Sequence, residues 1–598
     1  MSSKFRFLLS PRFLFFYAVI ALVVPNVALC FTEHMPFLAC LVNIFLPLSA
    51  YTMLMSLSRK TGRQVWMLFP LVFFAAFQMV LIYLYGNGVI AVDMFLNLVT
   101  TNPGEAMELL DNLVPAVAGV VILYLPLLVI AAVQWAKHVS IDDRGCRAPA
   151  RHNSHNSHNS HNNQRFLFRA RRWSLYGVGV FAVITAVCYF CYPKGNEAKG
   201  RFEYHVEDNM YPANVFYNLY LAVRESYRSA HYKENVANFR FNARPTHAKD
   251  STEVYVLVIG ETARSENFQL YGYRRPTNPE LMQTSGLMVF RDVRSQSNTT
   301  HKSVPMLLSA ATAEDHDRLY HEKGILAAFH EAGFYTVFLS NQQPNHSYID
   351  FLGEEANEHL FIRNGGLPSA AQPSAQSSST SSSATLYSDE RLLPFLDRVL
   401  SENHKKLFVV LHMYGSHFNY RDRYPQSRAR FLPDTPTEAK AENRPQLLNA
   451  YDNTILQTDH ILAAVISRLR KGHHAAALLY TSDHGENIFD DSRRLFLHAS
   501  PRPSQYDTDV PLLVWTSPEY AAQHASVVSG MKRNIKKGVQ SNASVFPTML
   551  SIAGIEAKAR VDSLSLTNPA YRLGTRHYLD DHNHAVPLSM YGIGNATH

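Results

Sequence analysis

Acidic and histidine side chains follow short β-like runs in the C-terminal half of the chain. Glu261 comes directly after one such run, and Asp483 and His484 come at the end of another. When parallel strands form a sheet, their carboxyl ends meet at one edge, so these three side chains should lie close together. Carboxylates and imidazoles are suitable zinc ligands, and a hydroxyl whose proton the metal displaces would complete the set. The sequence therefore predicts a metal site at this edge.

Three further histidines, His412, His417 and His498, fall in or near the same strand ends. Each of them alone is more often a packing or surface residue than a ligand, and either acidic sequence alone could be an ordinary turn. Because every strand end that should border a site carries a ligand-type residue, we favour a functional interpretation of the whole group.

Five apolar, β-branched runs alternate with amphipathic segments beyond residue 251. The runs are 253–260, 334–340, 406–413, 475–483 and 510–517, and helix-like segments such as 389–400 and 447–469 separate them. This alternation predicts an α/β domain whose largely parallel sheet is sandwiched by helices on both faces. A Ser-rich stretch at 368–385 is expected to be a flexible loop within that domain.

Five segments before residue 192 are apolar and close to the ~20 residues that cross a bilayer as a helix. They are 13–31, 36–57, 65–85, 113–136 and 174–191. The first is longer than a signal-peptide core and the second follows almost at once, so we expect it to remain in the protein. The sequence thus predicts an α-helical membrane domain of five transmembrane helices.

Charge in the connecting loops predicts how these helices are oriented. Lys and Arg precede the first segment, follow the second and fill the linker 137–172, which places these loops in the cytoplasm. The loop 86–112 has acidic residues and no Lys or Arg, as expected on the other side. Five spans then leave residues 192–598 outside the cytoplasm. The His/Asn/Ser repeat at 152–163 is expected to be a disordered linker rather than a metal site.

Three parts follow from this interpretation: a five-span membrane domain 1–191, connecting helices 192–250 at the membrane surface, and a globular domain 251–598. The connection contains an amphipathic stretch at 215–227. A net charge of +7 is modest for 598 residues, and no basic stripe interleaved with aromatics is present, which argues against nucleic-acid binding. All five cysteines precede residue 192, so the globular domain needs no disulfides.

Seven segments of the globular domain carry a recognisable pattern. They are VIGETARSENFQLYGYRRPTNPEL (258–281), SNTTHKSVPMLLS (297–309), LHMYGSH (411–417), AYDNTILQTD (450–459), TSDHGEN (481–487), FLHASP (496–501) and SVFPTMLSIAGI (544–555). With them the chain resembles the lipid phosphoethanolamine transferases of bacterial inner membranes, members of the alkaline phosphatase and sulfatase superfamily. The five-span anchor is also the architecture of that family, so the resemblance covers nearly the whole chain.

The resemblance implies a zinc site made of Glu261, Thr300, Asp483 and His484, with Thr300 as the catalytic nucleophile. An ordinary threonine hydroxyl is too weakly acidic to attack phosphorus at neutral pH, and coordination to zinc would make its alkoxide accessible. Thr299 is a competing nucleophile, and Ser297 is a further one. The resemblance also assigns His417 and His498 to holding the phosphate of the substrate or a second zinc, with His412 as a weaker member.

Three residues of the loop 86–112, Asn97, Thr101 and Glu105, match family positions proposed to hold the lipid donor. They recur every four residues, so on a helix they would share one face. Glu105 could pair with the ethanolamine ammonium. The alternative is that these three residues form an ordinary solvent-exposed face of a helix and bind no lipid.

The function implied by the resemblance is transfer of phosphoethanolamine from phosphatidylethanolamine to lipopolysaccharide, on lipid A or on a core sugar or phosphate, through a phosphoethanolamine-threonine intermediate. The enzyme would be a monomer of the bacterial inner membrane, in contact with membrane lipids, with its catalytic domain in the periplasm. The nearer alternative is a phosphoglycerol transferase, or another head-group transferase or hydrolase of the same superfamily. An inactive, metal-stabilised module that binds envelope lipids is the other.

The chain departs from the best-known branch of the family in three places. It has Ser295-Gln296-Ser297-Asn298 where that branch has Cys-Gly, it lacks that branch's disulfides in the soluble domain, and residues 342–346 replace a lysine-bearing loop. These differences leave the metal-ligand set intact, and they bear on the acceptor and on head-group recognition.

Overall fold

The computed structural model describes residues 10–85, 92, 95, 103–141, 157–193, 202–364, 388–500 and 502–594. The chain divides into two compact units, which are described separately. One unit comprises the residues up to Ala91 together with Leu109–Tyr220, and the other comprises Val92–Glu108 together with Leu221–His598. The Ser-rich stretch 368–385, for which we expected a loop, lies outside the described residues.

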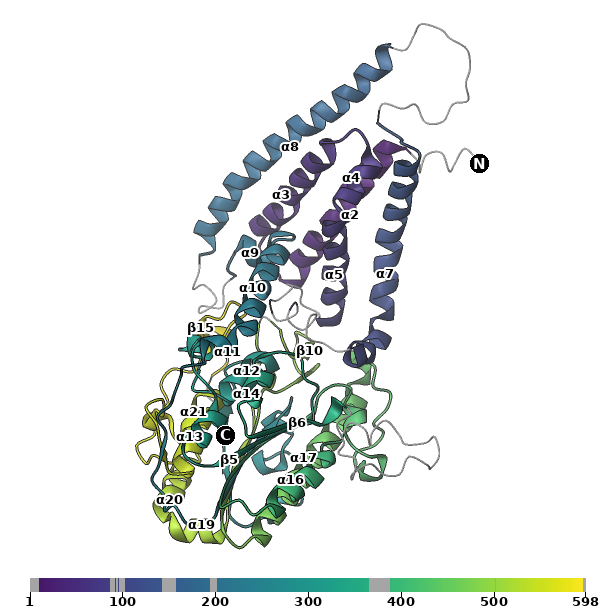
Figure 1. The fold of residues 1–598 in the computed structure, drawn as a ribbon. Helices are drawn as coiled ribbons and strands as arrows, with labels where there is room; N and C mark the ends of the chain where they lie inside the picture. The colour runs from purple at the N-terminus through teal and green to yellow at the C-terminus, as the bar shows by residue number, and fades with distance from the viewer. Residues whose placement is uncertain are drawn as a thin grey trace. The chain divides into compact units, whose positions relative to one another are not determined.

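The first unit is built from apolar helices (Figure 1). They are α2 (Pro11–Thr32), α3 (Phe37–Ser56), α4 (Thr61–Met67), α5 (Phe69–Tyr85), α7 (Pro103–Ala136) and α8 (Ser157–Cys191), of which the start of α7 belongs to the second unit. Helices α2, α3, α7 and α8 are each long and apolar enough to cross a membrane. These four helices coincide with the first, second, fourth and fifth predicted spans.

The third predicted span, 65–85, is a bent pair of helices. Helices α4 and α5 are separated by a break at Leu68 and differ in direction by 62°. Pro70 explains the break, because proline lacks the amide hydrogen needed inside a helix but fits the first turn of a new one. The described helices therefore give four spans, or five if this pair crosses as one.

Helix α8 begins earlier than the fifth predicted span. It starts at Ser157, so it includes the second half of the repeat 152–163, for which we expected an irregular linker. The segment that joins the repeat to the span contains Arg, Leu and Ala, which are good helix formers, so the helix continues beyond its apolar part.

The described part of the connecting region contains three helices. They are α9 (Val206–Asn209), α10 (Ala213–Ala230) and α11 (Tyr232–Asn235). Helix α10 contains the predicted amphipathic stretch, and it exposes large apolar side chains, namely Phe216, Tyr220, Val223 and Tyr227.

The second unit contains a mixed seven-stranded sheet with the order β3-β11-β8-β2-β7-β5-β6. The strands are β2 (Glu253–Gly260), β3 (Leu287–Phe290), β5 (Tyr335–Ser340), β6 (Glu358–Phe361), β7 (Lys406–His412), β8 (Ala475–Ser482) and β11 (Leu512–Thr516). Strands β8, β2, β7, β5 and β6 run parallel, and β11 runs antiparallel to both of its neighbours. All five predicted strands are present, and the predicted α/β class is confirmed.

Smaller strand pairs surround this sheet. They are β1 (Arg244–Pro245) with β13 (Ile555–Glu556), β4 (Asp292–Arg294) with β12 (Gly538–Gln540), β9 (Asn487–Ile488) with β10 (Phe496–Leu497), and β14 (His577–Leu579) with β15 (Ala585–Pro587). The β1–β13 pair ties the segment entering β2 to a strand near the C-terminus of the domain.

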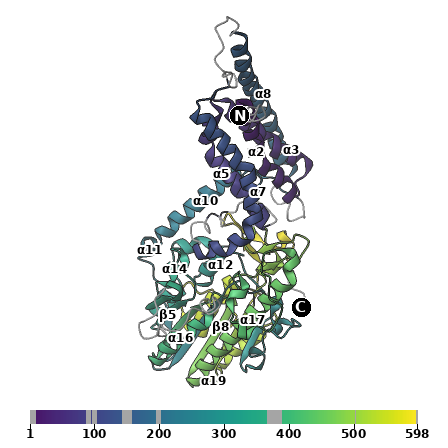
Figure 2. The ribbon, with the colours of Figure 1, turned by 90° about the vertical axis from the view of Figure 1, so that its right-hand side faces the viewer.

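Helices cover both faces of the sheet (Figures 1 and 2). The helices described after β2 are α12 (Thr300–Leu307), α13 (Ile325–Glu331), α14 (Tyr348–Gly353), α16 (Leu392–Ser401), α17 (Arg444–Lys471), α18 (Gln505–Thr508), α19 (Pro518–Gln523), α20 (Ala525–Asn534) and α21 (Ser541–Ile552). Tyr255, Leu257 and Ile259 of β2 share one core with α12, α13, α14 and α21. Helices α16 and α17 lie on the opposite face. The central strands β2 and β8 are thus buried along their whole length.

Candidate active site

Two buried acids and a histidine meet where β2 and β8 end. The strands pair in parallel with Gly260 opposite Ser482, so the next residues, Glu261 and Asp483, leave the sheet side by side. His484 Nε2 lies 3.2 Å from Asp483 Oδ2 and 3.6 Å from Glu261 Oε1. None of these three residues exposes more than 1% of its surface. The register of two parallel strands therefore creates this cluster.

Thr300 completes the cluster from a different part of the chain. It is the first residue of α12, and its Oγ1 lies 3.2 Å from Glu261 Oε1 and 3.1 Å from His484 Nε2. In the sequence, Thr300 lies 39 positions from Glu261 and more than 180 from Asp483 and His484, yet the four residues that the resemblance grouped form one contact cluster.

The competing hydroxyls have other partners. Thr299 Oγ1 lies 3.2 Å from Ser297 Oγ, and Ser297 Oγ accepts the amide hydrogen of Thr299. Both side chains are buried. Of these three hydroxyl groups, the one on Thr300 is hydrogen-bonded to the acid and histidine cluster.

The cluster has the electrostatics of a cation site. Burial disfavours the charged ring of His484, but the carboxylates of Asp483 and Glu261 outweigh this effect and raise its pKa. Asp483 Oδ2 is buried and accepts no hydrogen bond within the described part of the chain. His484 Nδ1 lies 2.8 Å from the carbonyl oxygen of Gly485, to which it can only donate, so Nε2 faces the acids. One ligand atom from each of the three residues lies within 4.8 Å of the others. This donor set fits zinc.

The predicted histidines lie around the same point. The ring centroids of His498 and His484 are 4.1 Å apart, and those of His498 and His417 are 6.4 Å apart. Burial lowers the pKa of His417 and of His498 to about 3, so both rings are neutral at physiological pH. His412, the last residue of β7, is buried with its Nδ1 3.2 Å from Ser340 Oγ. Burial lowers its pKa to about 4.

Further side chains hold Glu261 in place. Gln342 Nε2 donates to Glu261 Oε2 at 3.0 Å and to the Met413 carbonyl at 3.0 Å. The hydroxyl of Thr262 donates to Glu261 Oε1 at 2.8 Å, and Thr262 has a φ of 63°, which is rare for a β-branched residue and typical of strained functional sites. The sequence did not lead us to expect either contact. The one sequence signal for Gln342 was its position just after the end of β5, at the same edge of the sheet as Glu261.

Arg264 ties together the loops around the site. It is 3% exposed, forms a bidentate pair with Asp490 at 2.6 and 3.2 Å, and donates to the Glu486 carbonyl at 2.9 Å. Although burial opposes ionisation of Asp490, Arg264 lowers the pKa of this carboxyl below its usual value. The pair fixes the strand end that carries Glu261 against the segment that follows His484.

A cavity lies beside the nucleophile position. Its volume is about 480 Å³, and the two residues that follow Thr300, His301 and Lys302, line it together with Arg224, Glu225 and His346. Its size is within the range of small-molecule sites, and its mixed charges suit a ligand that carries both a phosphate and an ammonium group.

The residues predicted to hold the lipid donor are not placed by the structure. Asn97 and Thr101 lie outside the described residues. Glu105 falls within α7, but its side chain also lies outside the described part.

Comparison with known proteins assigns the domain that carries this site. The family model described as Sulfatase matches residues 253–555, which is just over half of the chain and spans the strands and loops described above. The chain belongs to the sulfatase family. The match begins at the first residue of β2 and includes Glu261, Thr300, Asp483 and His484.

Individual relatives of this sulfatase-family chain are transferases by name. A putative transferase, YhbX, of Escherichia coli strain K12 is 29% identical over 343 residues, or 56% of each chain. The Kdo(2)-lipid A phosphoethanolamine 7''-transferase of the same strain is 30% identical over 287 residues, or 46% of each chain. The chain thus matches about half the length of these curated relatives.

One solved structure aligns with nearly the whole chain. It is the integral membrane lipooligosaccharide phosphoethanolamine transferase A (EptA) of Neisseria meningitidis, with a TM-score of 0.69 over 94% of this chain and 98% of that one. The sequence identity is 20%, so the likeness establishes a shared fold, including the helical part.

Arg264→Met should lower the free energy of unfolding of the sulfatase-family unit by about 1.5–3 kcal/mol, because it removes the charge-assisted hydrogen bonds from Arg264 to the buried Asp490 carboxylate and leaves Arg444, at 2.8 Å, as the remaining cationic partner among the described residues. Denaturant unfolding of the detergent-solubilised chain measures this, with the buried Trp515 of β11 as a fluorescent reporter. Arg398→Met is the matched control, since Arg398 forms its ion pairs with Glu358 and Glu402 at the surface. It should cost less than about 1 kcal/mol. Equal losses in the two variants would contradict the structural role of the Arg264 pair.

Proposed function

We propose that this protein is a phosphoethanolamine transferase that uses phosphatidylethanolamine as donor and lipopolysaccharide, on lipid A or the core, as acceptor. The observation that carries the proposal is the Thr300 hydroxyl, 3.2 Å from Glu261 Oε1 and 3.1 Å from His484 Nε2. A nucleophile is needed where a group is transferred through a covalent intermediate. The activity named for the Kdo(2)-lipid A relative supports the choice of head group and acceptor.

Glu261, Thr300, Asp483 and His484 would hold one zinc ion, and His417 with His498 would hold the phosphate of the substrate or a second ion. Zinc at the first position would lower the pKa of the Thr300 hydroxyl and stabilise negative charge on the phosphoryl group. The buried Asp483 oxygen that accepts no hydrogen bond supports this assignment.

The transfer takes place in two displacements. In the first, Thr300 Oγ1 forms a bond to the phosphorus of phosphatidylethanolamine and the bond to the diacylglycerol oxygen breaks. The proton that Thr300 gives up ends on diacylglycerol. In the second, an acceptor oxygen attacks the phosphoethanolamine-threonine, the bond to Thr300 breaks, and the hydroxyl is restored by the proton of the acceptor.

His417 can act as a proton acceptor in the second displacement. Its Nδ1 lies 2.6 Å from the Phe418 carbonyl oxygen, to which it can only donate. Because burial lowers the pKa of His417 to about 3, the ring is neutral and its Nε2 presents a lone pair. This nitrogen can accept the proton of the acceptor group or ligate a metal, so of the two roles that the resemblance gives His417, ligation of a second ion fits this tautomer.

The membrane setting belongs to the same proposal. Residues 1–191 form the membrane domain, 192–250 connect it along the surface, and 251–598 form the catalytic domain on the periplasmic side of the inner membrane. The apolar helices and the Lys/Arg-rich loops support this arrangement. Asn97, Thr101 and Glu105 would contact the lipid donor. Since donor and acceptor are both membrane lipids, a monomeric enzyme anchored beside them needs to search in two dimensions only.

Thr300→Ala should abolish transfer of labelled phosphoethanolamine while leaving the fold intact, because it removes the attacking oxygen and little else. Mass spectrometry of the enzyme after incubation with head-group-labelled phosphatidylethanolamine should find the adduct on Thr300 in the unaltered chain and no adduct in the variant. Thr299→Ala is the matched control, and it should retain the adduct.

An adduct on Thr299 or Ser297 would refute the assignment of the nucleophile. Labelled phosphatidylglycerol offered in parallel tests the donor class, since label transfer from it in place of phosphatidylethanolamine would favour a phosphoglycerol transferase. An unlabelled enzyme with either lipid would favour the inactive binding module.

His484→Ala should lower the zinc content of the purified chain by one ion, because it removes the one nitrogen ligand of the site. Elemental analysis after removal of loosely bound metal measures the content. His404→Gln is a control, since His404 pairs with Glu402 on the surface at 3.0 Å, and it should keep the zinc content of the unaltered chain. Full occupancy in His484→Ala would count against His484 as a ligand.

A further inference from the structure

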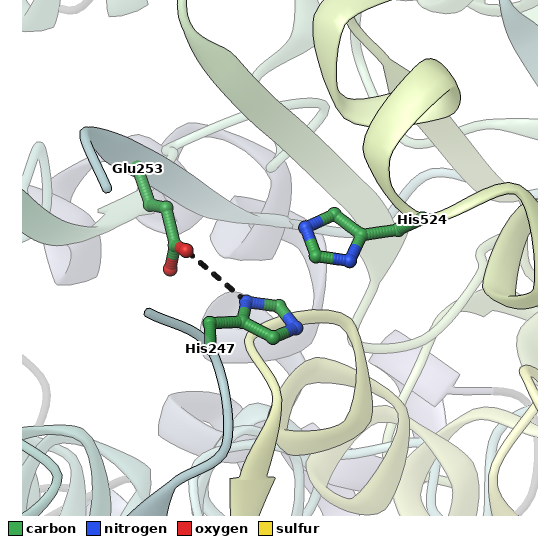
Figure 3. A group of neighbouring side chains, drawn as sticks. All are labelled: His247, Glu253 and His524. Atoms are coloured by element: carbon green, nitrogen blue, oxygen red, sulfur yellow. Dashed lines mark ion pairs between the residues drawn. The ribbon is translucent and has the colours of Figure 1, made fainter. Parts of the chain in front are cut away.

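A second group of metal-ligand side chains lies at the amino end of β2, at the opposite edge of the sheet from the active site. It consists of His247, Glu253 and His524 (Figure 3). Glu253 is the first residue of β2 and Glu261 follows the last, so at ~3.3 Å per residue the strand separates the two acids by about 26 Å. The group is therefore independent of the active site.

Three separate segments contribute to this group. His247 lies between β1 and β2, and His524 lies between α19 and α20. His247 Nδ1 is 3.2 Å from Glu253 Oε1, and the rings of His247 and His524 stack with their centroids 4.1 Å apart. Figure 3 shows the three side chains pointing toward one another. One ligand atom from each lies within 4.8 Å of the other two.

Two polar atoms of this group, Glu253 Oε2 and His524 Nε2, are buried and have no hydrogen-bond partner within the described part of the chain. Glu253 is 1% exposed, and its Oε1 accepts a hydrogen bond of 2.6 Å from Ser251. Lys406 Nζ approaches Glu253 Oε2 to 3.8 Å, beyond hydrogen-bond distance. A buried polar atom without a partner is costly, so the arrangement requires a further group to satisfy it.

The protonation states suit a cation. Burial opposes ionisation of Glu253, but its contacts with His247 and Ser251 outweigh this and lower its pKa, so it is a carboxylate. Burial and the neighbouring His247 lower the pKa of His524, so its ring carries a free lone pair at neutral pH. Metal ligands must be deprotonated in this way before an ion can bind.

The backbone holds both histidines in position. Thr246 donates through its amide and its hydroxyl to the Gly554 carbonyl, at 2.7 and 2.8 Å. A Cβ on Gly554, which has a φ of 60°, would lie 2.3 Å from the His247 ring, so the two segments pack as closely as they can. The amide of His524 donates to the Tyr520 carbonyl at 2.8 Å. These contacts fix the backbone from which each imidazole extends, and the side-chain torsions are left to adjust to an ion.

We propose that His247, Glu253 and His524 form a second binding site for a divalent cation of the zinc class. Two imidazoles and a carboxylate are a known zinc donor set, with a fourth position left for water. Ligand atoms on a tetrahedral zinc with bonds of about 2.0–2.1 Å lie about 3.3 Å apart, which rotation of these side chains can reach. Through its ligands the ion cross-links the segment that enters β2 to the residue between α19 and α20. A cross-link between segments so distant in sequence stabilises the fold by restricting the unfolded chain.

The zinc content of the full-length chain in detergent tests the proposal. The chain is stripped with a chelator, reloaded with zinc, passed over a sizing column and analysed for zinc per chain. His524→Gln and Glu253→Gln should each hold one zinc fewer than the unaltered chain and should lose the part of the zinc-dependent rise in melting temperature that this site provides. His404→Gln should match the unaltered chain, because the His404–Glu402 pair is not part of a three-ligand group among the described residues.

A measurement on the unaltered chain decides the question even if both variants fail to fold. Copper binds nitrogen and oxygen sites more tightly than zinc does, and ascorbate with dioxygen oxidises side chains next to bound copper. Peptide mass spectrometry of the copper-loaded chain should find oxidised His247 or His524, with suppression by prior zinc loading and an unmodified His404.

Zinc contents of the two variants equal to that of the unaltered chain, or unmodified His247 and His524 after copper treatment, would overturn the proposal. The group would then be an ion-pair network in which Lys406 and His247 balance Glu253. Neither result depends on the active site, because loss of the ion at His484 leaves all three residues of this group unchanged.

Discussion

The mutual proximity of two buried carboxylates, Glu261 and Asp483, is the constraint on which the rest of the structure depends. The parallel register of β2 and β8 places them side by side, and neither exposes more than 1% of its surface. Charges of one sign in a poorly solvated site repel strongly, so a positive charge beside them stabilises the arrangement. The two carboxylates raise the pKa of the adjacent His484. The zinc ion that we propose would stabilise the carboxylates further and would activate the Thr300 hydroxyl.

The surrounding contacts serve this geometry. Gln342 and Thr262 hold Glu261 in a single orientation, and the Arg264–Asp490 pair locks the loop after His484. Strain at Thr262 is tolerated because the neighbouring hydrogen bonds determine its position. The two edges of the sheet carry different groups. The carboxyl edge carries the proposed catalytic residues, and the amino edge carries His247, Glu253 and His524, for which we propose a second cation site.

The parts of the fold that the sequence predicted are those with local signatures. The five β-branched runs became strands, and Glu261, Asp483 and His484 could be grouped because parallel strands end at one edge. Thr300 required the family resemblance, since nothing local distinguishes its hydroxyl from that of Thr299. The antiparallel direction of β11 and the short strands β3 and β6 have no periodic signal of their own. The contacts of Gln342 and Arg264 depend on loops whose path is set by tertiary packing, and so does the convergence of His247 with His524.

The most direct test of the proposed metal site is an anomalous difference map from crystals of the full-length chain, with X-ray data collected at the zinc absorption edge. We expect a peak within about 2.0–2.2 Å of a carboxylate oxygen of Glu261, an oxygen of Asp483 and His484 Nε2, in contact with Thr300 Oγ1. A fully loaded chain with no peak among these four residues would contradict the proposed site.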